Sequence, residues 1–557
     1  MRNSRKQLKM WNNKMLGHHL RFMIGCGMVV TLLMGCSDDD APVNHEGGQI
    51  LAEAHMPARN PWLAQETYSI THFNSAQTDA FPYAVKDGVF DVNLEACAQT
   101  WAGPVNLMTL ASTSSDYMWG MSSDRVSYLR VANGKLERLA ECALPGVTPR
   151  TKEELKQLTA AYSSYDELEK AVTAVLGKQP QISMANGNYV VCDRENYVYS
   201  NAGRQLARYR LKQESRPEEG IEQVGVIDLA PYIANSFTLV GVSMTYDGYL
   251  VVAAQKALLT LSRELSVVDT YLLPEDQILT NSISLDEQSL YVASNSTQPE
   301  GKGLMQRIIC KGGRFSTAAA DGAWQAAYDG GPMAPSIKLG YGTGSTPTLM
   351  GFGPDDDKLV VITDGAKRMK LVAFWRDEIP ADAKASATGD PRVAGVFNIT
   401  CGLPESTEWV QSEQSVVVGG YDAFVVNNIS GGISKVSDKI VGVLAIGPIL
   451  EGPKGVECVR WNTQTNEWEA RWTRSDISSV SMIPAVSTAS DMVLVDGWYD
   501  ATGWEVTGLD WGTGRTRHQV RFGKDNRGNG AYAIIQYFPN GDLLFNSVAG
   551  PMRISLQ

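Results

Sequence analysis

Two consecutive stretches decide the fold. They are residues 240–274, VGVSMTYDGYLVVAAQKALLTLSRELSVVDTYLLP, and residues 282–315, SISLDEQSLYVASNSTQPEGKGLMQRIICKGGRF. In each, a short strand of small residues meets a turn that begins at Asp247 or Asp286, and a strand rich in β-formers follows. The two aspartates are 39 residues apart, which is near the period of a β-propeller blade. The spacing therefore predicts repeated four-stranded units.

The same pattern recurs in six further stretches: 105–131, 181–208, 346–380, 413–427, 480–495 and 531–556. One blade cannot bury its faces alone, whereas a ring of blades buries each face against the next. We therefore predict an all-β protein, a β-propeller of about eight four-stranded blades, with seven as the alternative. The last stretch offers only about three strands, so we expect a strand in residues 86–93, KDGVFDVN, to complete it.

One segment departs from the strand pattern. Residues 151–177 read TKEELKQLTAAYSSYDELEKAVTAVLG, with apolar residues at helical spacing. Thr151 with Glu154 forms a capping-box signature, and Ser164 begins a second one. Gly177 is a natural end for the second helix. We predict a two-helix insertion at 149–178 that lies over one face of the ring, either as covering decoration or as a lid.

The N-terminus carries a targeting signal. Residues 1–21 contain six Lys or Arg and no acid, and the apolar run FMIGCGMVVTLLM follows at 22–34. That run is too short for a lasting membrane span, which needs about 20 residues. It ends in LMGC at 33–36, which resembles a bacterial lipobox. We predict a signal peptide at 1–35, a lipidated Cys36 with a flexible tether at 36–66, and the propeller at 67–557.

The lipid anchor sets the predicted location. Several acyl chains of the palmitate type hold a protein at a membrane almost permanently. Ser37 after the cysteine resembles the default for delivery to the outer membrane. The acidic run at 38–40 resembles tethers that lead to the cell surface, or it is only a solvated linker. We expect a lipoprotein of the cell envelope, anchored in the outer membrane, whose partner besides the membrane is an envelope protein or a small molecule.

Composition excludes several classes of protein. The chain has 557 residues, 43% hydrophobic and 20% charged, with a net charge of −12. It is too apolar to be disordered and large enough for an extensive core. Its acidic balance opposes binding to nucleic acid, because phosphates would be repelled.

The cysteines allow two interpretations. Six remain after removal of the signal peptide and lipidation: Cys97, Cys142, Cys192, Cys310, Cys401 and Cys458. An even number in an exported protein is compatible with three disulfides. The pairs 97–142 and 401–458 each span about one repeat. The alternative is buried free thiols.

Histidines are scarce in the predicted body. Only His72 and His518 lie within it, which argues against a multi-histidine metal site. His72 belongs to the polar segment 68–82, YSITHFNSAQTDAFP, ahead of the first blade. If that segment folds over the channel mouth, His72 is a candidate general base that Asp79 orients. The alternative is a hydrogen-bonded histidine that packs an N-terminal arm.

The strand pattern of most of residues 100–557 resembles that of a broad superfamily of propellers. This superfamily includes the quinoprotein-like, strictosidine-synthase-like and calcium lactonase-like propellers. In the last of these, the resemblance implies a ring of Asn and Glu oxygens around Ca²⁺, a hard cation with six to eight oxygen ligands. Polar residues at the starts of predicted inner strands are the candidate ligands: Asn106, Asn281 and Glu413, with Thr346 and Gln414 nearby. The alternative for each is hydrogen bonding to backbone at a strand end.

Three functions follow from these patterns. The first is a lipoprotein that binds a partner or a small ligand at the rim of the channel. The second is a calcium-dependent lactonase-like or esterase-like hydrolase that uses the channel oxygens. The third is a quinone-dependent oxidoreductase, which needs a deep pocket with a tryptophan floor.

Overall fold

The computed structural model describes residues 55–556 apart from 66, 104–107, 234–235, 299–300, 339, 382, 385, 387, 433–435 and 437. All of these belong to one compact unit, residues 46–557. The predicted signal peptide, Cys36, most of the tether and Asn106 lie outside the described residues.

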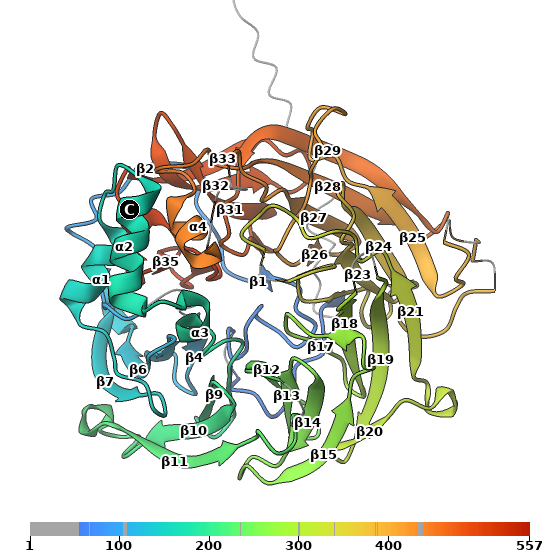
Figure 1. Ribbon diagram of the computed structural model, residues 1–557, viewed down its shortest axis with the longest axis horizontal. Coiled ribbons are helices and arrows are strands. Elements are labelled where there is room, and N and C mark those ends of the chain that lie inside the picture. The colour runs from blue at the N-terminus through green and yellow to red at the C-terminus, as the bar shows by residue number, and fades with distance from the viewer. Residues whose placement is uncertain are drawn as a thin grey trace, which may run out of the picture. The chain divides into compact units, whose positions relative to one another are not determined.

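The described strands form eight sheets that follow one another round a ring (Figure 1). The first contains β4 (Met108–Ala111), β5 (Tyr117–Met121), β6 (Arg125–Arg130) and β7 (Glu137–Ala143). The second contains β8 (Val191–Cys192), β9 (Val198–Ala202), β10 (Gln205–Leu211) and β11 (Ile221–Asp228). The third contains β12 (Leu239–Met244), β13 (Leu250–Ala254), β14 (Ala257–Leu261) and β15 (Val267–Leu272). The fourth contains β16 (Gln277–Ile278), β17 (Ser284–Leu285), β18 (Ser289–Ser296), β19 (Gly303–Lys311), β20 (Arg314–Ser316) and β21 (Trp324–Tyr328).

The second half of the ring repeats this order. The fifth sheet contains β22 (Thr348–Met350), β23 (Leu359–Thr363), β24 (Lys370–Trp375) and β25 (Val393–Asn398). The sixth contains β26 (Val417–Gly419), β27 (Asp422–Val426), β28 (Lys454–Asn462) and β29 (Glu467–Ser478). The seventh contains β30 (Ala485–Ser487), β31 (Met492–Tyr499), β32 (Gly503–Asp510) and β33 (Thr516–Gly523), with β1 (Ala80–Phe81) and β2 (Gly88–Asp91) at its edges. The eighth contains β34 (Gln536–Tyr537), β35 (Leu543–Ser547), β36 (Gly550–Ile554) and β3 (Ala98–Gln99). The predicted all-β propeller is confirmed.

The core lies between neighbouring sheets. Val251 and Leu258 of the third sheet share one buried cluster with Leu290 and Ile308 of the fourth. Every residue of β12, β13 and β14 is buried, whereas the outer strand β15 is mostly half-buried. Burial on both faces explains why the inner strands read as continuous apolar runs. Each sheet therefore depends on its neighbours for stability.

The N-terminal segment closes the ring, but not with the predicted strand. Residues 88–91 form β2, which pairs in parallel with β33 on the outer edge of the seventh sheet. The last sheet is instead completed by β3, which pairs with β36. The backbone N–H groups of Thr100 and Ala102 extend this contact toward Pro551 and Ala549. Both edges of the closing gap are thus covered by residues from one short N-terminal stretch, which leaves fewer open strand edges.

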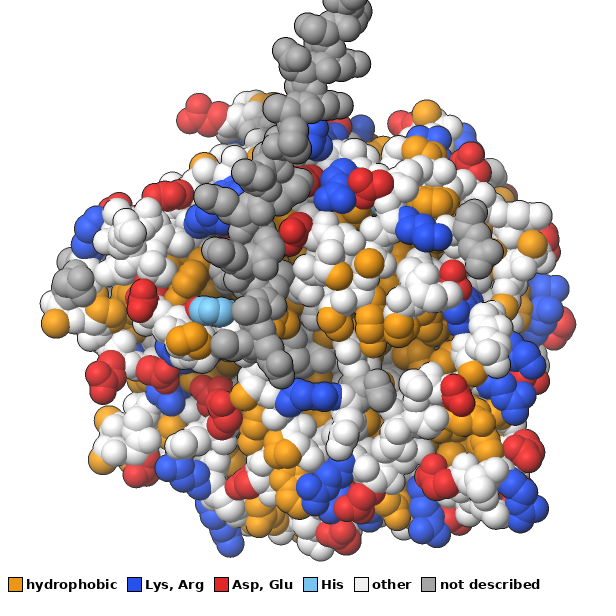
Figure 2. Space-filling view, turned by 180° about the vertical axis from the view of Figure 1, so that it is seen from behind, with side chains coloured by type: hydrophobic (Ala, Val, Ile, Leu, Met, Phe, Trp, Pro, Cys, Tyr) orange, Lys and Arg blue, Asp and Glu red, His pale blue; other side chains and the backbone are white. Residues whose placement is uncertain are grey.

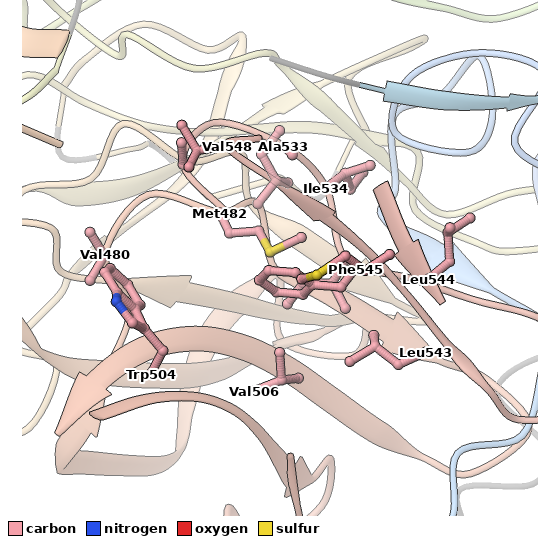
Figure 3. Close-up of a cluster of buried hydrophobic side chains, with 14 of the residues drawn as sticks. Val480, Met482, Trp504, Val506, Ala533, Ile534, Leu543, Leu544, Phe545 and Val548 are labelled. Carbon is pink, nitrogen blue, oxygen red and sulfur yellow. The ribbon is translucent and has the colours of Figure 1, made fainter. Parts of the chain in front are cut away.

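The two predicted helices are confirmed. α1 (Lys152–Thr159) begins with a complete capping box at Thr151, and α2 (Tyr165–Leu176) ends at Gly177, whose φ is 85°. Two further helices were not predicted, α3 (Pro180–Met184) and α4 (Lys439–Ala445). All four pack together on the face toward the viewer in Figure 1. Their apolar residues share one buried cluster with the last two sheets. Figure 3 shows side chains that those two sheets contribute to the cluster, such as Trp504 and Phe545.

Charged side chains of both signs are interspersed over the opposite face of the ring (Figure 2). Within the described part of the chain, no helix is long and apolar enough to cross a membrane.

Candidate functional site

A cavity of about 560 Å³ opens at one end of the ring's channel. Its wall comes mainly from residues that lie just before the first strand of successive sheets: Tyr189, Thr238, Asn281, Gly344, Glu413, Ser481 and Tyr532. Because the first strands of a propeller all run in the same direction, their N-terminal ends gather on one face. Met184 of α3 and Ile440 of α4 add to the wall from the helical side.

Most of the wall is apolar. Leu239, Val240, Leu279 and Ile483 are buried side chains of this wall. Phe237 also lines the cavity, and its 86% exposure places it where solvent enters. An apolar hollow with a few polar groups is the usual form of a small-molecule site.

The centre of the ring is occupied by the chain's own residues 68–81 (blue in the middle of Figure 1). Backbone carbonyls of this segment accept hydrogen bonds from inner strands of six sheets. The pairs are Tyr68 with Ala111, Ser69 with Cys192, Ser75 with Leu285, Ala76 with Leu349, Thr78 with Val418, and Asp79 with Val486. All its residues except Asn74 are buried. We call residues 68–81 the channel segment.

The channel segment holds an unusual backbone conformation. Tyr68, His72, Phe73, Gln77 and Asp79 all have φ between 59° and 74°. Residues with side chains rarely adopt this left-handed region, and each costs about 1–2 kcal/mol. Such a conformation persists only where the surroundings hold it firmly. Here the hydrogen bonds to six sheets do so.

The predicted pair of His72 and Asp79 is close together. His72 Nδ1 lies 2.7 Å from Asp79 Oδ1, and both side chains are fully buried. Burial raises the pKa of the Asp79 carboxyl, and the nearby His72 opposes part of that rise. His72 Nε2 and Asp79 Oδ2 are buried without a hydrogen-bond partner. The His72 ring stacks on Tyr189, which lines the cavity, so His72 lies one side chain behind the wall. Its role as a base stays a prediction.

Two of the three predicted calcium ligands line the same cavity, Asn281 and Glu413. The Asn281 oxygen already accepts hydrogen bonds from Thr346 Oγ1 at 2.9 Å and from the Ser282 N–H at 2.8 Å. Its Nδ2 donates to the Gly344 carbonyl. Among the described residues, no group of three or more His, Cys, Asp or Glu side chains is arranged to hold a metal ion. Calcium binding stays a prediction, and the third predicted ligand is not described.

Glu413 is the most unusual polar group of the wall. Its Oε1 is buried and has no hydrogen-bond partner in the described structure. Burial raises the pKa of Glu413 to about 8, while Lys439 and Lys338 pull it back in part. Burial also lowers the pKa of Lys338 to about 7, against the opposing charges of Glu413 and Asp364. Burial thus favours the neutral form of both groups.

Gln414, the other polar residue singled out beside Glu413, has a structural role. Its Nε2 donates to the Met482 carbonyl at 2.9 Å, and its oxygen accepts from Ser479. Thr346 likewise bonds Asn281. These side chains fix the strand ends that carry the wall.

His518, the second histidine of the body, is remote from this wall. Nδ1 faces the Lys86 carbonyl at 2.6 Å, and Nε2 faces the Tyr537 hydroxyl at 2.9 Å. A carbonyl only accepts, so Nδ1 carries the proton and Nε2 accepts from Tyr537. Burial lowers the pKa of His518 to about 4, so the ring is neutral at pH 7.

The predicted disulfides are not formed. All six cysteines of the body, Cys97, Cys142, Cys192, Cys310, Cys401 and Cys458, are free thiols. Four of them lie in four different buried clusters between sheets: Cys192, Cys310, Cys401 and Cys458. A separation of one repeat places two residues in different blades and does not bring their sulfur atoms together. The arrangement of the six cysteines in the structure is that of the second alternative, free thiols.

Several residues of the site escaped sequence analysis. They are Tyr189, Lys338, Lys439, Ser481 and Tyr532. Their position in the repeat could have identified Tyr189, Ser481 and Tyr532, because each lies two to four residues before an inner strand. Lys338 and Lys439 lie in a loop and in a short helix without any repeat signature.

The described N-terminal arm, residues 55–62, lies on the face opposite the cavity. The Ala58 carbonyl accepts from Tyr246, Asn60 donates to the Met244 carbonyl, and Trp62 packs against Gly248. These contacts are at the C-terminal end of β12, whereas its N-terminal end lines the cavity. A strand rises about 3.3 Å per residue, so about 17 Å separates the two ends of this six-residue strand.

No family model matches the chain. An uncharacterized protein of Archaeoglobus fulgidus is 27% identical over 376 residues, covering 64% of this chain and 66% of that protein. The chain thus spans just under two thirds of the length of the curated relative it matches.

Two solved structures illustrate the likeness in shape. A europium-containing methanol dehydrogenase has a TM-score of 0.48 and 9% identity, covering 86% of this chain and 89% of its own. A quinohemoprotein alcohol dehydrogenase from Comamonas testosteroni has a TM-score of 0.47 and 11% identity, covering 92% and 82%. Likeness at this level assigns no activity, so the chain is a β-propeller by its own strand pairing.

Proposed function

We propose that this protein is a lipid-anchored β-propeller of the cell envelope that binds a small, mostly apolar molecule in the cavity at its channel mouth. The observation that carries the proposal is the cavity itself. It is about 560 Å³ in volume and walled by Leu239, Val240, Leu279 and Ile483. The channel segment lies inside the ring against its inner strands, and its His72 ring stacks on Tyr189 of the cavity wall. Removing apolar ligand surface from water supplies the binding energy.

The remaining alternatives have less support. A calcium-dependent hydrolase would need the Asn281 oxygen, which two hydrogen bonds already occupy. A quinone-dependent oxidoreductase would need a tryptophan floor, and the described cavity wall contains no tryptophan. We therefore propose binding as the function.

Fluorescence titration with N-phenyl-1-naphthylamine, a neutral apolar dye, tests this proposal. We expect saturable enhancement with one site per chain. Val240→Phe should reduce it by filling the cavity. Val226→Phe is the matched control, because Val226 is 46% exposed on the outer strand β11. Circular dichroism and melting curves confirm that both variants fold. Equal dye binding by the two variants, or none by the wild type, would refute the proposal.

The anchor is the second part of the proposal. Lipidation of Cys36 would attach the tether on the side of residues 55–62, opposite the cavity. The cavity would then face away from the membrane. Metabolic labelling with radioactive palmitate should mark the wild type and not Cys36→Ser. Label on both proteins, or on neither, would refute lipidation at this cysteine.

A further inference from the structure

Two polar atoms of the cavity residues lack partners. Glu413 Oε1 and Ser481 Oγ are both buried without a hydrogen bond, and both residues line the cavity. Glu413 is 9% exposed and Ser481 1%. Buried polar groups of folded proteins are nearly always paired, so an unpaired one in a cavity wall requires a reason. A ligand that completes their hydrogen bonds supplies it.

The position of Ser481 fits this role. Its neighbours Val480 and Met482 both point into the hydrophobic cluster of the last two sheets (Figure 3). Ser481 lies between them and lines the cavity instead. An apolar side chain would suit this wall, which otherwise includes Ile440 and Ile483. The hydroxyl therefore adds a hydrogen-bonding group to an apolar surface.

The charges around Glu413 determine what its carboxyl can bind. Lys338 and Lys439 are the cations that act on it, and the hydroxyls of Tyr189 and Tyr532 are the other titratable groups that sense its charge. Asp364 lies beside Lys338, and Asp438 acts on Tyr532. A cationic ligand would pair with Glu413 only if that carboxyl ionised against the effect of its burial. An anionic ligand would find no cationic side chain among the described lining residues, since neither lysine is one of them. Neither charge is therefore well accommodated.

We infer that the cavity selects a neutral molecule with an apolar body and one end that both donates and accepts a hydrogen bond, an alcohol or a carboxamide, which pairs with Glu413 and Ser481. This inference rests on the proposed function and specifies its ligand class. The carboxyl of Glu413 holds a proton below pH 8, where it can donate as well as accept. The Ser481 hydroxyl has the same dual capacity.

Four probes with one eight-carbon chain test the selectivity: 1-octanol, octanamide, octylammonium and octanoate. Each is measured by displacement of the naphthylamine dye. We expect the alcohol and the amide to bind at least tenfold more tightly than the two ions at pH 6.5. Tightest binding by octylammonium, or by octanoate, would overturn the inference.

The pH dependence of octanol binding supplies a readout on the unmodified protein. A ligand that expels water from the cavity further disfavours the charged form of Glu413. Octanol affinity should therefore fall as pH rises above about 8. The total fall should be about tenfold for each pKa unit by which bound octanol raises the pKa of Glu413. Glu413→Gln, which stays neutral, should bind octanol with little pH dependence. A flat wild-type profile would contradict the role of Glu413.

Ser481→Ala should weaken octanol and octanamide at least fivefold and leave the dye unaffected. The matched control is Ser284→Ala, because Ser284 is also buried with an unpaired hydroxyl but does not line the cavity. Dye binding without preference among the four probes would overturn this inference and leave the proposed function standing. Absence of dye binding would refute the proposed function first.

Discussion

His72 Nδ1 and Asp79 Oδ1 lie 2.7 Å apart inside the ring, on a segment whose backbone is bonded to six sheets. Both residues have left-handed φ values, 60° and 59°. The hydrogen bond thus joins two strained positions of the channel segment. The His72 ring also stacks on Tyr189, which lines the cavity.

Substitutions of Asp79 separate the hydrogen bond from the backbone conformation. Asp79→Asn keeps an acceptor and tolerates φ near 60°, so its stability should change least. Asp79→Gly keeps the conformation and leaves His72 unpaired, at a cost of about 1–3 kcal/mol. Asp79→Ala should lose about 1 kcal/mol more from strain. Chemical denaturation gives the order, and equal loss in all three would show that neither feature contributes.

The contact that closes the ring can be tested by substitution of Gly550. A Cβ there would lie 2.1 Å from the Thr100 carbonyl oxygen, and φ is 115°. Gly550→Ala should therefore destabilise the protein by more than 2 kcal/mol, roughly the strain plus a severe overlap. Gly541→Ala is the matched control in the same sheet, with φ of 83° and its nearest neighbour at 3.5 Å. Equal effects of the two variants on the melting temperature would mean that the contact at Thr100 is loose.

The lowered pKa of His518 predicts that the folded protein loses stability in acid. Its pKa is about 4 in the folded protein and 6.5 as the reference value for the unfolded chain. The stability gained from a neutral ring is complete above about pH 6.5 and is lost as pH falls toward 4. The shift corresponds to about 3 kcal/mol at most. Denaturation of the wild type and of His518→Asn between pH 7 and 4 should show the slope only in the wild type. Parallel profiles would exclude His518 as its source.

Lipid-anchored protein bound to vesicles tests whether the cavity faces toward the membrane or away from it. Fluorophores on Phe237→Cys, at the cavity, and on Glu287→Cys, in the exposed turn at the opposite end of the neighbouring sheet, report the two faces. Quenchers in the lipid headgroups should dim the label at 287 much more than the label at 237. Fluorophore attached to the native cysteines is measured on the protein without an added cysteine and is subtracted. Stronger quenching at 237 would reverse the orientation.

Sequence predicted the repeated architecture well because it depends on local signals. Asp247 and Asp286 mark turns, and the continuous apolar sequence of inner strands such as β13 indicates that these strands are buried. Thr151 and Gly177 likewise define helix ends through contacts within a few residues.

The site was predicted only in part because it depends on contacts between distant residues. Glu413 and Asn281 were found by their place before an inner strand, but Lys338 follows no such rule. The path of the channel segment rests on hydrogen bonds to strands as far away as Val486. Composition and periodicity do not indicate which non-glycine residues, such as Phe73, adopt a left-handed backbone conformation.

The most direct test of the central claim is to locate a bound molecule. Crystals soaked with 8-bromo-1-octanol give an anomalous signal from bromine, which fixes the position of the chain end. We predict one bromine peak inside the cavity, with the hydroxyl density within hydrogen-bond distance of Glu413 and Ser481. Bromine bound elsewhere on the ring, with the cavity filled only by water, would contradict the account.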